Sequence, residues 1–405
     1  MTEERTLPEG WRWVCFGDVV RQVKQSTKDP EKDGLTRIVG LDHLDSESLP
    51  VRRWDELEDL PDGTSFTRIF RAGQVLFGKR RAYQRKVGVA DFDGVCSGDI
   101  LVFEPSGDEL LAEFLPYLVQ SDEFVSHALS TSAGSLSPRT KWQELAKFEF
   151  GLPPIDEQVS IGRVLLAHDE LATQYGRIVS SLVPLRLATF QDALTGPEML
   201  RTAWGQTRDD SPVRLLGEIC RVVRGSSPRP KGDPLYFASE RTPHHWIMIS
   251  DLSRSRVGKW LTDTEEFLTD LGVEKSRAVP AGTLLLTNCA TVGVPVFAGI
   301  DGCIHDGFLA FDEFDSVQPA YLYRLFEFLT PWFRNIAQTG TQANLNTGIL
   351  KSLEVPVLPA SEQKRLTASL DELDEIGVAA SDALDAARSA RRATLTAMIG
   401  GSELT

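Results

Sequence analysis

The stretch LPPIDEQ, residues 152–158, decides the fold, because VLPASEQ at residues 357–363 repeats it 205 positions later. This shift places Pro154 on Pro359 and Gln158 on Gln363. The match continues without a gap from ATFQDAL (188–194) to ATLTAMI (393–399). Because repetition at a fixed spacing is the mark of a duplicated structural unit, the chain is predicted to be a tandem repeat.

Segments upstream of the two phrases recur in the same order. Chance could produce one such echo, but not easily a whole ordered set. We therefore expect two domains of mixed helix and strand, at 1–154 and 213–359, each followed by a long helix, at 155–196 and 360–400, with a linker at 197–212. The recurring pairs are FGDVVRQV (16–23) with LGEICRVV (216–223), FRAGQVLFGK (70–79) with VPAGTLLLTN (279–288), and DFDGVCSGD (91–99) with GIDGCIHDG (299–307).

The two phrases have the composition of helix starts. Proline ends the preceding element. Asp156 in the first copy and Ser361 in the second can then cap a helix, each followed by a glutamate. Gly196 and Gly400 are predicted to end the helices. Each helix of about 40 residues would be roughly 60 Å long.

Apolar spacing predicts that the two helices pack on each other as a coiled coil. Pro184 lies inside the first helix and is expected to kink it. The alternative is two ordinary amphipathic helices in a larger core. The apolar positions are Val164, Leu171, Tyr175, Ile178, Leu182 and Leu185 in the first helix, and Leu366, Leu370, Leu373, Gly377, Ala380, Leu384 and Ala387 in the second.

The composition excludes several classes of protein. The chain has 405 residues, 41% hydrophobic and 25% charged, which is typical of globular domains. We expect neither a membrane span nor a secretory signal. Five scattered cysteines fit a reducing cytoplasm. A net charge of −15 argues against a protein that coats nucleic acid through bulk charge.

Motifs of a self-sufficient enzyme are absent from the sequence. It has no phosphate-binding G-x-x-x-x-G-K-[ST] loop, no G-x-G-x-x-G, no H-E-x-x-H and no G-x-S-x-G. It also lacks the Asn/Asp-Pro-Pro-aromatic motif that an amino-methyltransferase needs. The adjacent His244 and His245 would point to opposite faces of a strand, so they form a poor metal pair. We expect no catalytic or metal site in this chain.

Basic clusters lie in the two variable domains and are accompanied by residues that can contact bases. Arginine and lysine pair with phosphate or guanine, asparagine and glutamine with adenine, and serine or threonine with either kind of site. Solvated loops are the alternative for any single cluster, but in an acidic chain basic clusters favour binding faces. The candidate DNA-binding residues are Lys79, Arg80, Arg81, Tyr83, Arg85, Lys86, Ser137, Arg139, Lys141, Arg224, Ser226, Ser227, Arg229, Lys231, Asn288, Thr291, Gln342 and Asn344.

This organisation resembles the specificity (S) subunit of type I restriction–modification systems. The resemblance covers nearly the whole chain and is carried by the two helix starts, by LSPRTKW (136–142), by GTQANLNTGILKSLEVPVLP (340–359) and by GEICRVVRGSSPRPKGDP (217–234). It implies an α+β fold with two target-recognition domains, whose helices form an antiparallel coiled coil with pseudo-two-fold symmetry.

The resemblance also implies partners that carry the chemistry. Two modification subunits would supply S-adenosylmethionine and the adenine-methylating residues, and motor-nuclease subunits would use ATP and Mg for translocation and cleavage of double-stranded DNA. This chain would hold no cofactor, would lie in the cytoplasm without membrane contact, and would serve phage defence. Alternatives are a specificity-like subunit of another phage-defence methyltransferase complex, a fused restriction–methylation enzyme, and a scaffold that binds only proteins.

Two further expectations concern the target. The net charge predicts weak DNA binding by the isolated chain. The segment GKRRAYQRK (78–86) of the first domain has TNCATVGVP (287–295) as its counterpart in the second. This difference predicts an asymmetric bipartite site, with half-site centres about one helical turn apart.

Overall fold

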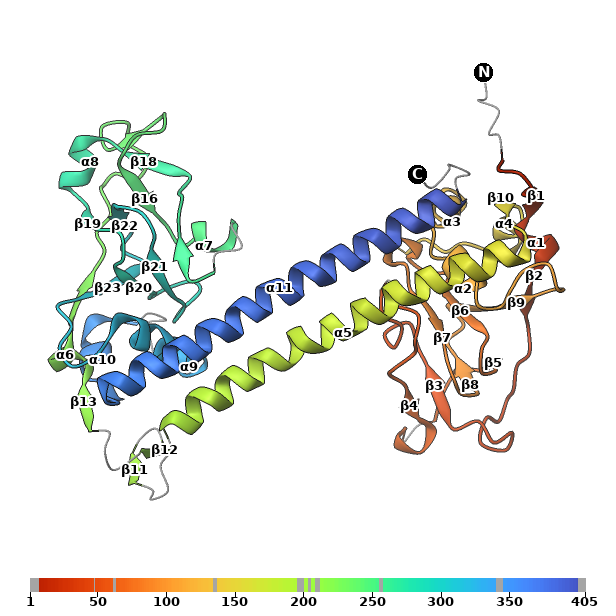
Figure 1. Cartoon of the computed structure of the whole chain (residues 1–405), viewed down its shortest axis with the longest axis horizontal. Coiled ribbons are helices and arrows are strands. Elements are labelled where there is room, and N and C mark those ends of the chain that lie inside the picture. The colour runs from red at the N-terminus through yellow and green to blue at the C-terminus, as the bar shows by residue number, and fades with distance from the viewer. Residues whose placement is uncertain are drawn as a thin grey trace. The chain divides into compact units, whose positions relative to one another are not determined.

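The computed structural model divides the chain into two compact units, which are considered separately (Figure 1). Unit 1 consists of Met1–Ile178 and Ala379–Thr405, and unit 2 of Val179–Val378. None of the described helices combines the length and the apolar character that crossing a bilayer requires. The structure describes residues 7–46, 48–60, 63–133, 137–194, 200–202, 205–207, 212–254, 258–339 and 345–399.

Unit 1 has two four-stranded sheets, in the orders β2-β9-β6-β7 and β4-β3-β8-β5, and the antiparallel pair β1-β10. Strands β3 and β8 pair in parallel, whereas β5 runs antiparallel to β8. The two larger sheets share an apolar cluster that includes Phe70, Leu76 and Val102. The strands are β1 (Arg12–Cys15), β2 (Val20–Val23), β3 (Arg37–Val39), β4 (Asp55–Glu56), β5 (Arg68–Phe70), β6 (Val75–Gly78), β7 (Val87–Val89), β8 (Gly94–Cys96), β9 (Ile100–Pro105) and β10 (Glu149–Leu152).

Short helices cover one sheet of unit 1 and complete a second apolar cluster, which contains Phe16, Phe103 and Phe124. The sequence SDEF shows why one of these helices begins where it does. Ser121 Oγ accepts a hydrogen bond from the Phe124 amide, and two acids follow the serine. The helices are α1 (Phe16–Val19), α2 (Leu115–Leu118), α3 (Asp122–Ser130), α4 (Trp142–Leu145) and the 3₁₀ turns η1 (Leu57–Asp59) and η2 (Ala82–Gln84).

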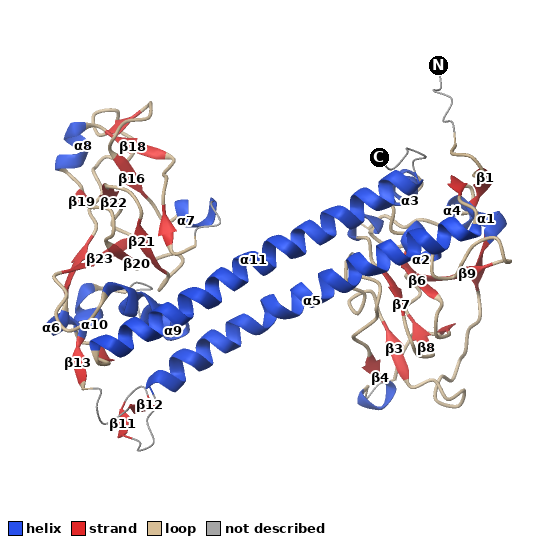
Figure 2. Ribbon diagram, viewed as in Figure 1, coloured by secondary structure: helices blue, strands red, loops and turns tan. Residues whose placement is uncertain are grey.

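Unit 2 repeats this arrangement (Figure 2). Its sheets have the orders β14-β23-β20-β21-β17 and β15-β18-β16-β22-β19, and β13 pairs with β24 as β1 pairs with β10. Strands β16 and β22 pair in parallel and β19 runs antiparallel to β22, as in unit 1. The strands are β13 (Val213–Leu215), β14 (Arg221–Arg224), β15 (Phe237–Ala238), β16 (His245–Ile247), β17 (Trp260–Leu261), β18 (Glu266–Leu268), β19 (Arg277–Val279), β20 (Leu284–Thr287), β21 (Pro295–Ala298), β22 (Gly302–Ile304), β23 (Phe308–Asp312) and β24 (Glu354–Pro356).

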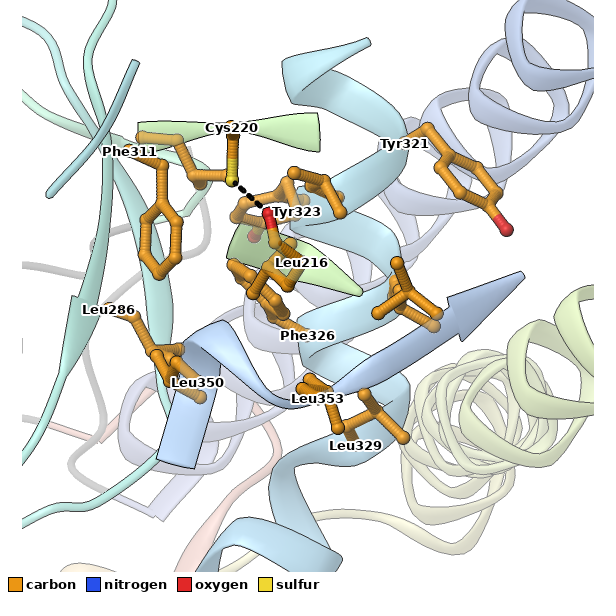
Figure 3. Packing of buried hydrophobic residues seen from close by; sticks show 14 of the residues in the cluster. Leu216, Cys220, Leu286, Phe311, Tyr321, Tyr323, Phe326, Leu329, Leu350 and Leu353 are labelled. Carbon is orange, nitrogen blue, oxygen red and sulfur yellow. Dashed lines mark hydrogen bonds between the residues drawn. The ribbon is translucent and has the colours of Figure 1, made fainter. Parts of the chain in front are cut away.

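The core of unit 2 lies between its first sheet and α9 (Pro319–Thr339), whose Phe326 and Leu329 belong to it (Figure 3). Leu286 and Phe311 meet them from the sheet. The duplication inferred from the sequence is therefore confirmed in the topology. The other helices are α6 (Leu216–Ile219), α7 (Asp251–Arg254), α8 (Asp270–Glu274) and α10 (Thr347–Lys351), and a hairpin is formed by β11 (Leu200–Thr202) and β12 (Gly205–Thr207).

The two long helices, α5 (Ile155–Leu194) and α11 (Ala360–Ile399), have 40 residues each. Both begin one residue after a proline, so Asp156 and Ser361 lie inside the first turn. The prediction that they cap the helices is therefore wrong. Proline occupies the position before each helix because its lack of an N–H costs nothing there. Gly196 and Gly400, the predicted ends, lie outside the described residues.

Buried glutamines anchor both helix starts. In unit 1, Gln158 Nε2 donates to the carbonyls of Glu109 (2.8 Å) and Pro153 (2.9 Å), and its Oε1 accepts from the Leu111 amide (2.9 Å). In unit 2, Gln363 forms the same pattern with Ser316 (3.0 Å), Leu358 (2.8 Å) and Gln318 (2.7 Å). The repeated glutamine therefore ties each long helix to the domain before it.

Antiparallel packing of α5 and α11 is visible within each unit. In unit 1, Asp169 of α5 contacts Arg391 near the end of α11. In unit 2, Leu182 of α5 lies against Gly377 of α11, where an added Cβ would meet the leucine at 3.3 Å. The predicted pairing of the helices is confirmed, and the absence of a side chain at Gly377 permits their close approach.

The apolar positions predicted for α11 are buried at Leu366, Leu370, Ala380 and Ala387. For α5 the prediction is right at Leu182, which is buried, but wrong at four other positions of the row. Val164, Leu171, Ile178 and Leu185 are 39–48% exposed, whereas Ile161, Leu165, Leu182 and Phe190 are buried. Helix α5 carries more than one apolar row, and spacing alone cannot tell which row the rest of the fold covers. We call Val164, Leu171 and Ile178, which belong to unit 1, the α5 apolar stripe.

Candidate nucleic-acid interface

Two of the predicted basic segments of unit 1 lie side by side. A β-bridge joins Arg80 to Arg139. The Arg81 amide donates to the Pro138 carbonyl (3.0 Å), and the Thr140 amide donates to the Lys79 carbonyl (3.1 Å). Segments about 60 positions apart therefore form one basic surface, whose candidate residues at 79–81 and 137–141 were predicted separately.

Asp99, in the turn between β8 and β9, organises this surface. Arg139 Nε donates to Asp99 Oδ1 (2.8 Å), and Arg80 Nη1 lies 3.6 Å from Asp99 Oδ2. Arg80 also donates to Ser137 Oγ (3.0 Å). The hydrogen bond from Arg139 lowers the pKa of Asp99, while burial lowers the pKa of Lys79. The carboxylate fixes two arginines that the sequence suggests as DNA contacts.

The tip of the 79–86 loop has an uncommon backbone. Arg81 and Arg85, which flank η2, have φ values of 55° and 50°. This is the left-handed backbone region, which residues other than glycine rarely adopt. Tyr83 between these arginines is 55% exposed, and Arg81 is exposed too. The tip therefore presents an aromatic ring and a guanidinium to solvent. Lys141, just before α4, is also exposed.

Two candidates at the end of this loop turn inward. Arg85 donates to the Gln120 carbonyl (3.2 Å) and pairs with Asp122. Lys86 Nζ donates to the Leu41 carbonyl (2.5 Å). In this conformation both side chains hold the loop against the rest of unit 1.

In unit 2, Asp306 gathers candidates from two segments. Ser227 Oγ donates to Asp306 Oδ1 (2.7 Å), and Arg229 Nη2 lies 3.6 Å from Asp306 Oδ2. The Asp306 carbonyl accepts from Arg224 Nε (2.9 Å) and from Asn288 Nδ2 (3.1 Å). Candidates predicted at 224–229 and at 288 are thus brought together around one residue.

Electrostatics at this second cluster resemble those at the first. Burial acts to raise the pKa of Asp306, but the Ser227 hydroxyl and the neighbouring cations outweigh it, so the pKa lies below its ordinary value. Burial lowers the pKa of His305, whose Nε2 lies 3.0 Å from Asp306 Oδ1. A carboxylate that stays ionised is therefore the fixed counter-charge of Arg224 and Arg229.

The other candidates of unit 2 differ in exposure. Ser226 donates to the Lys275 carbonyl (3.2 Å), and both Lys231 and Thr291 are exposed. Asn288 is buried, so its position here is structural. Gln342 and Asn344 lie outside the described residues.

Sequence reasoning missed the two organising acids. Asp99 lies between β8 and β9, and Asp306 lies in the corresponding turn between β22 and β23. A signal was present, since DFDGVCSGD and GIDGCIHDG form one of the repeated pairs and each carries an acid in this turn. Among the described residues, no group of three His, Cys, Asp or Glu side chains could hold a metal ion.

Comparison with known proteins identifies the class. A family model described as "Type I restriction modification DNA specificity domain" matches residues 8–177 and 209–382. Because these two matches span most of the sequence, the chain belongs to this family.

Two curated relatives of this chain are specificity subunits of type I restriction enzymes. The chain is 28% identical over 218 residues to the specificity subunit of the type I restriction enzyme EcoDI of Escherichia coli, covering 53% of this chain and 47% of that one. It is 27% identical over 183 residues to the MjaIX specificity subunit of Methanocaldococcus jannaschii, covering 44% and 41%. The matched region thus spans about half the length of these curated relatives.

Two solved structures share the fold. One is the S subunit of a type I restriction–modification system from M. genitalium, with 13% identity, a TM-score of 0.61, and coverage of 100% of this chain and 99% of that one. The other is a chain from a structure of type I complex assembly and conformational transition, with 20% identity, a TM-score of 0.61, and coverage of 98% and 99%. At such identities the likeness concerns the fold alone.

Proposed function

We propose that this chain is the DNA sequence-specificity subunit of a type I restriction–modification complex. The observation that carries the proposal is the duplicated cluster of cations around Asp99 in unit 1 and around Asp306 in unit 2, within a chain of this family. Each cluster contains guanidinium and hydroxyl groups, which are among the groups that contact phosphates and base edges. The proposed recognition residues are the candidates predicted from the sequence.

The target is an asymmetric bipartite sequence. The basic loop of unit 1 presents Tyr83 and Arg81 at its tip, whereas its counterpart in unit 2, TNCATVGVP (287–295), contains the exposed Thr291 and no aromatic residue. Different side chains on a repeated frame select different bases. The proposed domains, 1–154 and 213–359, are joined to the helices at 155–196 and 360–400, so the number of base pairs between half-sites is fixed.

Catalysis belongs to partner subunits. Two modification subunits supply S-adenosylmethionine and the methylating residues, and motor-nuclease subunits supply ATP-driven translocation with Mg. The α5 apolar stripe supports partner docking, because large apolar side chains in a row on one exposed helix are typical of a protein–protein interface. The complex acts in the cytoplasm in phage defence.

Single-molecule sequencing of host DNA, with and without the gene, tests this proposal. We expect methylated adenines in a split, asymmetric motif that disappears when the gene is deleted. A continuous or palindromic motif, or methylation that persists after deletion, would contradict it.

A DNA-binding assay tests the role of the acidic composition. With a net charge of −15, the chain alone should bind its target weakly, and the modification subunits should strengthen binding. Equal affinity with and without those subunits would contradict this expectation. The same assay separates the specificity subunit from a scaffold that binds only proteins, because the scaffold would show no sequence preference.

A further inference from the structure

A pocket in unit 1 has four arginines and a glutamine among its lining residues. It lies where the last turns of α11 face the segment after α2 and the end of the 79–86 loop. The lining residues are Arg85, Gln120, Arg388, Arg391, Arg392 and Leu395.

Gln120 leaves a hydrogen-bond donor without an acceptor beside this pocket. The residue is 2% exposed, and its Oε1 accepts a hydrogen bond from Arg391. That bond fixes the orientation of the amide, because the opposite orientation would bring Nε2 against a guanidinium donor. Nε2 is then buried with no partner. A buried unsatisfied N–H costs free energy, and a bound acceptor would remove that cost.

The arginines provide positive charge that nearby acids offset only in part. Asp122 pairs with Arg85, and Asp169 pairs with Arg391 (2.7 Å). Arg388 forms no ion pair within the described part of the chain, and its side chain is exposed at the pocket. Arg388 and the buried Gln120 Nε2 therefore offer donors that suit an anion.

Unit 2 contains a corresponding pocket with a more apolar lining. The 205-residue shift places Arg388, Arg391 and Arg392 on Val183, Arg186 and Leu187, all of which line a pocket of unit 2. There Glu327 binds Arg186 (2.9 Å). The repeat has therefore kept the cavity in both units, but the positions of Arg388 and Arg392 are apolar in unit 2. A structural role shared by both pockets would not require the two extra arginines.

We propose that the unit 1 pocket binds a phosphate group, held by Arg388, Arg392 and Gln120 Nε2. Arginine forks suit phosphate oxygens, and the buried amide adds a directional donor. The phosphate can come from free phosphate or from a DNA backbone. The second source rests on the proposed function, because Arg85 belongs to the candidate DNA-binding loop.

Calorimetric titration of the intact chain with sodium phosphate, at ionic strength matched with sodium chloride, tests the site. We expect saturable binding. The double substitution Arg388→Val and Arg392→Leu, which installs the residues of unit 2, should weaken binding at least tenfold. Leu187→Ala in the unit 2 pocket is the matched control and should not change binding. Absence of binding to the wild-type chain, or equal binding by the double variant, would overturn the proposal.

Folding and the source of the phosphate are checked separately. Thermal unfolding of the double variant shows whether its lost binding reflects lost structure. Arg388→Val alone changes one exposed side chain and is measured in the same way. If DNA is the source, phosphate competes with target DNA and the double variant also binds DNA several-fold more weakly. If free phosphate is the source, DNA affinity stays unchanged. Loss of methylation specificity tests the proposed function, whereas calorimetry with phosphate does not depend on it.

Discussion

Asp169 Oδ1 lies 2.7 Å from Arg391 Nε, so the first half of α5 is joined to the last half of α11 within unit 1. Shifted by 205 positions, the same two residues become Asp374 and Arg186, which pair at 3.0 Å within unit 2. Each long helix thus contributes an aspartate near its beginning and an arginine near its end. Their reciprocal pairing fixes the antiparallel register.

We predict that Asp169→Asn destabilises the chain by about 3 kcal/mol, because it leaves the Arg391 guanidinium buried without its counter-charge. Adding Arg391→Met should recover part of the loss. Denaturant unfolding of the two single variants and the double variant gives the coupling energy. Additive effects would mean that the pair does not stabilise the helix contact.

The anchoring glutamines lead to a second prediction. Gln158→Ala or Gln363→Ala removes a side chain that satisfies three backbone groups, two of them carbonyls, and should cost about 2–3 kcal/mol. Lys364→Ala, next to Gln363 but exposed, is the control and should cost less than about 0.5 kcal/mol. Urea unfolding measures both, and equal losses for Gln363→Ala and Lys364→Ala would contradict the anchoring role.

The pKa of Asp99 gives a pH dependence. Arg139 holds this pKa below its ordinary value of 3.8, so the folded chain binds the Asp99 proton more weakly than the unfolded chain does. The resulting stability is present above about pH 3.8 and is lost as the pH falls through the lower, folded pKa.

Thermal unfolding between pH 6 and pH 3 can measure this effect. The advantage of the wild-type chain over Asp99→Asn should be constant near pH 6 and should shrink below about pH 3.8. An advantage that grew on acidification would have the wrong sign and would exclude the ion pair as its cause.

The α5 apolar stripe gives a prediction about assembly. Leu171→Asp together with Ile178→Asp changes exposed positions, so the unfolding free energy should shift by less than about 1 kcal/mol. Binding of a modification subunit, measured by calorimetry, should weaken at least tenfold. Gln174→Asp adds a charge to an exposed position between them and is the control. Unchanged binding by the double variant would remove the stripe from the interface.

The duplication, the positions of the long helices and their packing on each other could be predicted from the sequence. All three depend on residue spacings that occur in both copies of the repeat. The sequence did not locate the helix caps. Asp156 has a side chain suited to capping, but the helix begins one residue before it, directly after Pro154. The sequence also misplaced the buried row of α5, because exposure of Leu171 and Ile178 depends on what else covers the helix.

Only part of the candidate site could be predicted from the sequence. Residue types identified the basic loops, but the loops meet only in the folded chain, where Arg80 and Arg139 bridge. Asp99 and Asp306 were not foreseen because their partners are distant in sequence. The recurrence of an acid in this turn of both copies was a signal, but it does not show which cations the acid will contact.

These two acids have a consequence for the energetics of DNA binding. A free arginine that reaches a DNA phosphate releases a mobile salt ion, and this release makes affinity depend steeply on salt concentration. Arg139 and Arg229 already hold a counterion that is part of the protein, in Asp99 and Asp306. If these arginines contact DNA, a DNA phosphate replaces the aspartate as the partner of each arginine. The affinity should therefore respond to salt less steeply than the number of phosphates contacted would suggest.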